Sequence, residues 1–302
     1  MKWGYVLGAI AAASYGMNPL FALSLMNAGI SANGVLMFRY FFAIPLLVFM
    51  MIARGRSFKV GKKQWVPLIL MGFVMSGSSL TLYLSYHYIG ASIASTLLFI
   101  YPILTAVIMA VLYKERISVL TVFCVVLAMS GIALLYKGGN GNTLNLSGVM
   151  IVFLSALLYA IYLVACSRPI LKEIPTLTLT FYVITFGMFL FLPEFDIHSV
   201  SILNTHWYFW LDAFGLALFP TAISLLATSA AIQKVGSTPV AILGALEPVT
   251  AVAISCTVFR EPMTLRLAIG MVLVILAVSF IIAGPSVAHA FLRVRKMFPK
   301  IK

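Results

Sequence analysis

Long apolar runs separated by short polar gaps constrain the fold of this chain more than any other feature. A bilayer core about 30 Å thick is crossed by a helix of roughly 20 apolar residues. Runs close to that length cover residues 3–26, 33–53, 67–87, 91–113, 118–136, 147–167, 177–193, 207–232, 238–259 and 264–284. The runs are continuously apolar, whereas the strands of a membrane barrel alternate. We therefore expect an all-α integral membrane protein with ten transmembrane helices.

Charged side chains are too few to cover a soluble protein of this length. Of the 302 residues, 63% are hydrophobic and 9% are charged, whereas soluble proteins carry about 25% charged residues. The 20 Lys and Arg residues outnumber the 7 Asp and Glu residues, but they lie mostly in the gaps between apolar runs. This placement is typical of loops that flank a membrane, so we expect a lipid bilayer and no nucleic acid as partner.

The distribution of Lys and Arg predicts how the chain is oriented. If the N-terminus lies in the cytoplasm, most basic residues fall on that side, including those of the loop 54–63 and of the C-terminal segment 285–302. The positive-inside rule then places both termini in the cytoplasm. We expect the basic tail 285–302 to rest on anionic lipid headgroups.

The sequence contains an internal repeat. An offset of 146 residues aligns 90–118 with 236–264 without a gap, and it pairs Pro102 with Pro248. Each half holds an odd number of predicted spans, so the second copy must be inverted in the membrane. Inverted repeats are typical of secondary transporters, in which two similar halves surround a central site. The sequence therefore predicts two inverted five-helix repeats, although a duplicated channel or membrane enzyme also fits this pattern.

The ends of the two repeats carry similar motifs, IYPILTAVIMAVLYKERISVL at 100–120 and LEPVTAVAISCTVFREPMTLRL at 246–267. Together with Arg39 in the second span, they resemble the EamA module of the drug/metabolite transporter superfamily. The resemblance covers 4–136 and 147–283 as two tandem modules. It implies a multi-pass carrier of small metabolites in the inner (plasma) membrane, typically an exporter, with a central cavity between the halves.

Glu247 is the only acidic residue deep within a predicted span, roughly 13 Å from its inner end at a rise of 1.5 Å per residue. The first repeat has Tyr101 at the equivalent position, so the two halves are not chemically equivalent. A buried carboxylate is costly unless it is paired, neutral or facing water. Two interpretations remain open: Glu247 gains and loses a proton during transport, or it is held in one fixed hydrogen-bonded arrangement.

Arg39 lies roughly 9 Å below the outer end of its span by the same helical rise. A guanidinium cannot lose its proton to escape that environment, so Arg39 needs a partner. Depth favours a fixed ion pair with Asp212. A substrate carboxylate is the alternative, because Arg binds carboxylates through two parallel hydrogen bonds.

Four tyrosines are further candidates for substrate binding. Tyr15, Tyr101 and Tyr159 fall at similar depths near the middle of their spans, and Tyr83 lies nearer the outer side. A Tyr side chain offers a flat apolar face and one hydroxyl, which suits a cavity that holds amino acids or aromatic compounds. Packing within the protein is the simpler explanation for any one of them.

Pro102 and Pro248 are predicted to bend their helices near the middle of the bilayer. Proline lacks a backbone N–H, so each of them leaves the carbonyl four residues earlier without its helical donor. Such carbonyls can bind substrate, or neighbouring groups can satisfy them.

The sequence shows no cluster of His, Asp or Glu typical of a catalytic or metal site, so we expect no enzyme, metal or cofactor. The favoured function is a secondary transporter that exports a small organic metabolite by alternating access, with an amino acid or an aromatic compound preferred. Proton coupling through Glu247 is a hypothesis. A channel or a non-transporting membrane scaffold is the alternative, and the sequence does not predict the oligomeric state.

Overall fold

The computed structural model describes residues 2–89, 94, 97–114, 118–135, 145–257, 265, 268–277 and 279–280, and this part of the chain contains helices and no strand. Five helical segments are long and apolar enough to cross a membrane: Lys2–Asn27, Ala32–Ala53, Lys62–Ile89, Leu146–Cys166 and Trp207–Val235. They confirm five of the ten predicted spans. Shorter apolar helices lie within four others: Tyr101–Tyr113, Val119–Gly131, Thr176–Met188 and Ala268–Ala277. The predicted tail 285–302 lies outside the described residues.

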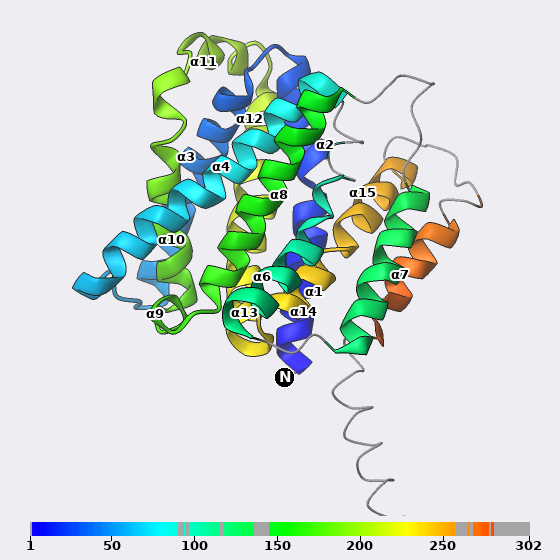
Figure 1. Ribbon diagram of the computed structural model, residues 1–302. Coiled ribbons are helices and arrows are strands. Elements are labelled where there is room, and N and C mark those ends of the chain that lie inside the picture. Colours follow the sequence, from blue (N-terminus) through cyan, green and yellow to red (C-terminus); the bar gives the residue numbers. More distant parts are fainter. Residues whose placement is uncertain are drawn as a thin grey trace, which may run out of the picture.

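The helices follow one another along both halves of the chain (Figure 1). The first half contains α1 (Lys2–Gly16), α2 (Asn18–Asn27), α3 (Ala32–Ala53), η1 (Lys62–Gln64), α4 (Trp65–Ile89), α6 (Tyr101–Tyr113) and α7 (Val119–Leu135). The second half begins with α8 (Leu146–Cys166), α9 (Pro169–Lys172), α10 (Thr176–Met188), η2 (Leu192–Glu194), α11 (His198–Leu203) and α12 (Trp207–Leu216). It continues with the π-helical segment η3 (Ala217–Ile223), α13 (Ser224–Val235), α14 (Ser237–Leu243) and α15 (Leu246–Thr257).

The first helix of each half packs against the other half, α1 on α13 and α8 on α4. Glycines permit both close approaches: a Cβ atom on Gly4 would lie 2.6 Å from Val235, and one on Gly148 would lie 2.7 Å from Ile89. The sequence offset of 146 residues relates Ile89 to Val235. The two contacts are therefore equivalent in the repeat, and small residues at such crossings let membrane helices approach closely.

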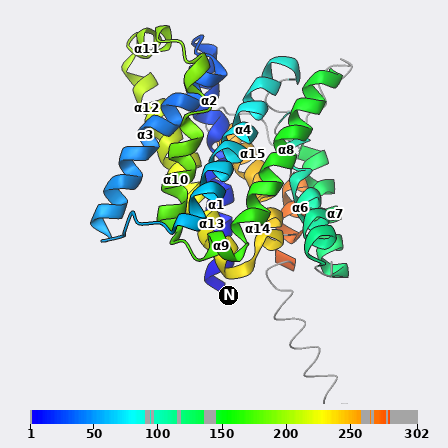
Figure 2. The ribbon, with the colours of Figure 1, turned by 60° about the vertical axis from the view of Figure 1, so that its left-hand side comes forward.

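The helices α1 and α8 run in opposite directions. The N-terminus at the start of α1 and the short helix α9, which follows the end of α8, lie at the same end of the molecule, whereas α11 lies at the opposite end (Figures 1 and 2). The first helices of the two halves thus cross the molecule with opposite polarity.

The two predicted bends are breaks in the structure. The helix α6 begins at Tyr101 with Pro102 in its first turn, and α15 begins at Leu246 with Pro248 in its first turn, after a turn at Gly244 and Ala245. Proline is tolerated in a first turn because the N–H groups there have no helical acceptor. The residues Tyr101 and Glu247 thus become equivalent first-turn residues of two half-length helices.

Candidate functional site

The structure brings the six predicted site residues into one connected group. The guanidinium of Arg39 lies 5.6 Å from the ring centroid of Tyr15 and close to Tyr83. Tyr15 interacts electrostatically with both Arg39 and Glu247. The remaining two, Tyr101 and Tyr159, have ring centroids 4.8 Å apart and both interact with Glu247.

A distorted turn of the eighth span anchors Arg39. Its Nε donates a hydrogen bond to Thr221 Oγ1, and its Nη2 donates to the carbonyl of Pro220 at 2.9 Å. Pro220 has no N–H and so cannot make an α-helical bond to the carbonyl of Leu216, and Thr221 Oγ1 donates to that carbonyl at 2.7 Å. Both anchors lie in the π-helical segment η3, and such segments are frequent at functional sites.

One nitrogen of Arg39 remains available. The side chain is fully buried, and its Nη1 has no hydrogen-bond partner among the described residues. The hydroxyl of the neighbouring Tyr40 is likewise buried and unpartnered. A buried donor without an acceptor is costly, so Nη1 of Arg39 favours an acceptor such as a ligand carboxylate.

The predicted ion pair between Arg39 and Asp212 is wrong. Asp212 Oδ2 accepts a hydrogen bond of 2.6 Å from Ser24 on α2, and Arg39 uses its donors on η3. Depth along a span does not determine which way a side chain points around the helix axis. The two residues therefore share a depth without sharing a contact.

Polar groups at the break in the first span complete the surroundings of Arg39. The hydroxyl of Tyr83 donates a hydrogen bond of 2.7 Å to Asn18 Oδ1, and Asn18 is buried at the start of α2. Asn18, Tyr40 and Thr221 are not among the residues predicted from the sequence. Two of them could have been found from neighbouring prolines, because prolines within apolar runs mark helix breaks. One such proline follows Asn18, and another precedes Thr221.

Glu247 lies in the interior at the start of α15, and only 7% of its surface is exposed. Tyr15 from α1, Tyr101 from α6 and Tyr159 from α8 interact with it electrostatically. Its carboxylate has no hydrogen-bond partner among the described residues. Whether Glu247 exchanges a proton or keeps one fixed arrangement stays a prediction.

The site contains both signs of charge, and each comes from a different half of the chain. Arg39 belongs to the first half and Glu247 to the second, and Tyr15 interacts with both. A guanidinium binds carboxylates, a carboxylate binds ammonium groups, and aromatic faces bind apolar side chains or cations. This arrangement suits a small molecule that carries a carboxylate, an amine and an apolar group.

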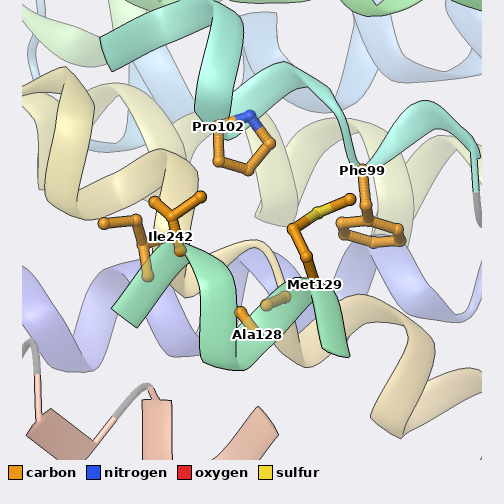
Figure 3. A pocket seen from close by; sticks show the side chains of 7 residues that line it. Phe99, Pro102, Ala128, Met129 and Ile242 are labelled. Carbon is orange, nitrogen blue, oxygen red and sulfur yellow. The ribbon is translucent and has the colours of Figure 1, made fainter. Parts of the chain in front are cut away.

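A small apolar pocket lies beside the broken helices. Side chains of α6, α7 and α14 and of the adjoining turns line it, including Phe99, Pro102, Ala128, Met129 and Ile242 (Figure 3). No charged or hydroxyl-bearing side chain is among the lining residues. The pocket is therefore distinct from the charged site, although Pro102 directly follows Tyr101.

No group of three His, Cys, Asp or Glu side chains that could hold a metal ion occurs within the described ranges. The predicted site residues are instead one Arg, one Glu and four Tyr, which are typical of ligand binding. Their contact with substrate stays a prediction.

Comparison with known proteins identifies the family. The sequence pattern of the EamA-like transporter family matches residues 2–137 and again residues 146–283. The uncharacterized transporter YdfC of Bacillus subtilis (strain 168) is 26% identical over 260 residues, which cover 84% of this chain and 80% of that protein. An uncharacterized transporter of Archaeoglobus fulgidus is 22% identical over 198 residues, which cover 65% of this chain and 69% of that protein.

A protein of known crystal structure shares the fold, with a TM-score of 0.75 and 16% sequence identity over 92% of this chain and 95% of the other. Two family matches that span nearly the whole sequence agree with the apolar helices of a multi-pass membrane protein. The chain belongs to the EamA-like transporter family.

Proposed function

We propose that this protein is a secondary transporter that exports a small zwitterionic metabolite, preferably an amino acid with an apolar or aromatic side chain. The observation that carries this proposal is the presence of Arg39 and Glu247 near the same residue, Tyr15, with one donor of Arg39 and the carboxylate of Glu247 free of protein partners among the described residues. Membership of a transporter family supports the transport function.

In this proposal each part of the substrate has a partner. The substrate carboxylate accepts a hydrogen bond from Nη1 of Arg39, and its ammonium group pairs with Glu247. The rings of Tyr101 and Tyr159 contact the side chain of the substrate. A zwitterion neutralises both buried charges at once, whereas a ligand with a single charge leaves the other one unpaired.

Two inverted five-helix repeats would provide alternating access. Support comes from the opposite directions of α1 and α8 and from the equivalent contacts at Gly4 and Gly148. In such transporters a rocking motion of one half against the other exposes a central site to each side in turn. The broken helices α6 and α15 both begin at this site.

Glu247 couples transport to protons in this proposal. Its carboxylate accepts either a proton or the ammonium group of the substrate, so binding of one excludes the other. Because the proton and the substrate replace each other at Glu247, inward movement of a proton drives outward movement of the substrate. The absence of a hydrogen-bond partner for Glu247 within the described residues supports this role.

The test is Glu247→Gln, which keeps the size of the side chain and removes its titration. The amino acid that stabilises the wild type in a thermal-unfolding screen is used as substrate, and its flux across proteoliposomes is measured at mildly acidic and mildly alkaline pH. We expect the variant to fold and to lose the pH dependence of flux. Asp212→Asn, which changes a carboxylate bonded to Ser24, is the control and retains that dependence. Unchanged pH dependence in Glu247→Gln contradicts the coupling.

A further inference from the structure

The basic loop between α3 and α4 is docked on the second half of the chain. Thr178 Oγ1 of α10 donates a hydrogen bond of 3.2 Å to the carbonyl of Ser57, and the hydroxyl of Tyr182 donates one of 2.7 Å to the carbonyl of Phe58. The ring of Phe58 lies edge-on to that of Phe181, with centroids 5.5 Å apart. These contacts hold the loop through its backbone and an aromatic ring, so its charged side chains are not needed to fix its course.

A further contact brings basic residues of both halves together. Gln64 Nε2, in η1, donates a hydrogen bond of 3.2 Å to the carbonyl of Ile170, and η1 packs against α9. Lys62 and Lys63 also belong to η1, and Lys172 is the last residue of α9. All three lysines are exposed. We call them the lysine cluster; they flank the contact between the start of α4 and α9, which lie at one end of the molecule (Figure 1).

No carboxylate compensates the charge of the lysine cluster within the described part of the chain. Glu173 follows Lys172 but is exposed, and no ion pair joins it to the cluster among these residues. Lys62 and Lys63 directly precede α4, a helix of 25 residues that has no acidic residue in its first turn. The N-terminus of a helix carries a partial positive charge, which disfavours cations and favours anions. The cluster is therefore a place where an anion would relieve the repulsion between like charges.

The residues that follow the cluster place it at the level of lipid headgroups. Trp65 begins α4 and is 38% exposed, and its ring centroid lies 5.2 Å from that of Tyr182. Trp and Tyr are enriched where a membrane meets water. The next residue, Val66, is apolar and 64% exposed, as expected where the helix enters lipid. The positive-inside rule accounts for basic residues in such a loop, but it does not require the loop to dock on α9 and α10.

We propose that the lysine cluster binds the phosphate headgroup of an anionic phospholipid, and that this headgroup bridges η1 of the first half and α9 of the second. The inference goes beyond the proposed transport function and does not depend on the identity of the substrate. Each lysine supplies a compact positive charge with three hydrogen-bond donors for the phosphate oxygens. A lipid bound in this way adds to the contact between the halves that Gln64 makes with Ile170. A zwitterionic lipid has no net charge and leaves the charge of the cluster uncompensated.

The experiment uses Trp65 as a reporter of lipid contact. The full chain is reconstituted in phosphatidylcholine vesicles with a rising fraction of phosphatidylglycerol whose acyl chains are brominated, because bromine quenches tryptophan fluorescence at short range. Trp3→Phe, Trp207→Phe and Trp210→Phe remove the other tryptophans, which are all exposed. Brominated phosphatidylcholine gives the quenching that random contact produces. The thermal-unfolding midpoint of the chain with all four tryptophans is a second measure, since a lipid that binds the folded protein raises it.

Matched variants separate this site from general attraction to an anionic surface. Lys62→Gln with Lys63→Gln removes the charges on the first half, and Lys172→Gln removes the one on the second. Lys2→Gln with Lys234→Gln is the control, because both of these lysines are exposed and lie at the ends of α1 and α13, which pack against each other.

We expect phosphatidylglycerol to quench Trp65 at a lower fraction than phosphatidylcholine does. Each lysine removed from the cluster should raise the phosphatidylglycerol fraction at half-maximal quenching roughly fivefold, and the control should keep the unsubstituted value. Equal quenching by the two lipids overturns the site. Equal loss of preference in the control pair also overturns it, because the attraction then belongs to the whole surface. An unchanged value in Lys172→Gln overturns the bridge between the halves.

Discussion

Arg39 uses two of its nitrogens to hold its position and keeps the third for another partner. The bonds to Thr221 and Pro220 fix the plane of the guanidinium, and the ring of Tyr15 covers one side of it. A group fixed in this way presents Nη1 in one direction, which favours recognition of a planar carboxylate. Lysine has a single flexible ammonium group and cannot make both anchoring bonds and the ligand contact in the same geometry.

Arg39→Lys is therefore expected to weaken binding of a zwitterionic amino acid. A hydrogen bond to a charged group contributes about 1.5–3 kcal/mol, so the dissociation constant rises roughly tenfold or more. An amine that has the same side chain but no carboxylate is expected to bind both proteins equally. The shift of the thermal-unfolding midpoint with ligand concentration measures both affinities.

Arg168→Lys is the matched control for Arg39→Lys, since the Arg168 guanidinium lies 3.7 Å from the ring centroid of Tyr113, at the end of α8 and away from η3. Equal loss of affinity for the amino acid and for the amine in Arg39→Lys would contradict a specific carboxylate contact.

At the scale of the elements, α1 supports the start of the half-length helix α15. A Cβ atom on Gly16 would lie 2.5 Å from the carbonyl oxygen of Glu247 and 2.8 Å from Thr250 Cβ, and the first of these contacts is with backbone. The absence of a side chain at Gly16 thus lets α1 approach the turn that positions Glu247. Backbone cannot move aside as a flexible side chain can.

Gly16→Ala is expected to destabilise the protein by about 1–3 kcal/mol, because an added methyl group forces apart two packed helices. The midpoint of thermal unfolding should fall, and binding of the amino acid should weaken with it. Gly77→Ala serves as control, since its methyl group would meet Leu158 at an ordinary 3.4 Å. Unfolding of Gly16→Ala at the wild-type temperature would contradict the close contact between α1 and α15 at Gly16.

At the scale of the whole molecule, similar halves carry different chemistry. The contacts of Gly4 and Gly148 are equivalent, but the charged residues of the site are not, because Tyr101 occupies the place in the first half that Glu247 occupies in the second. A protein with two similar halves can interconvert between two conformations. A site with a different charge from each half can bind a ligand whose two ends differ. Both features together favour a single substrate orientation.

The fold was largely predictable because burial in a bilayer leaves a strong pattern in sequence. Apolar runs located the long helices, and Arg39 and Glu247 stood out because charges within such runs are costly. The partner of Arg39 could not be predicted, since residue depth gives no information on rotation about the helix axis. The sequence predicted bends where the structure has breaks before Tyr101 and Leu246. A proline in an apolar run does not show whether it lies within a helix or in the first turn of one.

The measurement that tests the central claim most directly is counterflow in proteoliposomes. Vesicles that contain the purified protein are loaded with one unlabelled amino acid, and entry of the same labelled amino acid is followed for each common neutral amino acid in turn. We predict that at least one apolar or aromatic amino acid enters with saturation and that internal substrate accelerates its entry. In Arg39→Lys, half-maximal acceleration should need a substrate concentration roughly tenfold higher or more. Flux that rises linearly with concentration, or that internal substrate does not accelerate for any amino acid, would contradict a carrier of zwitterions with one central site.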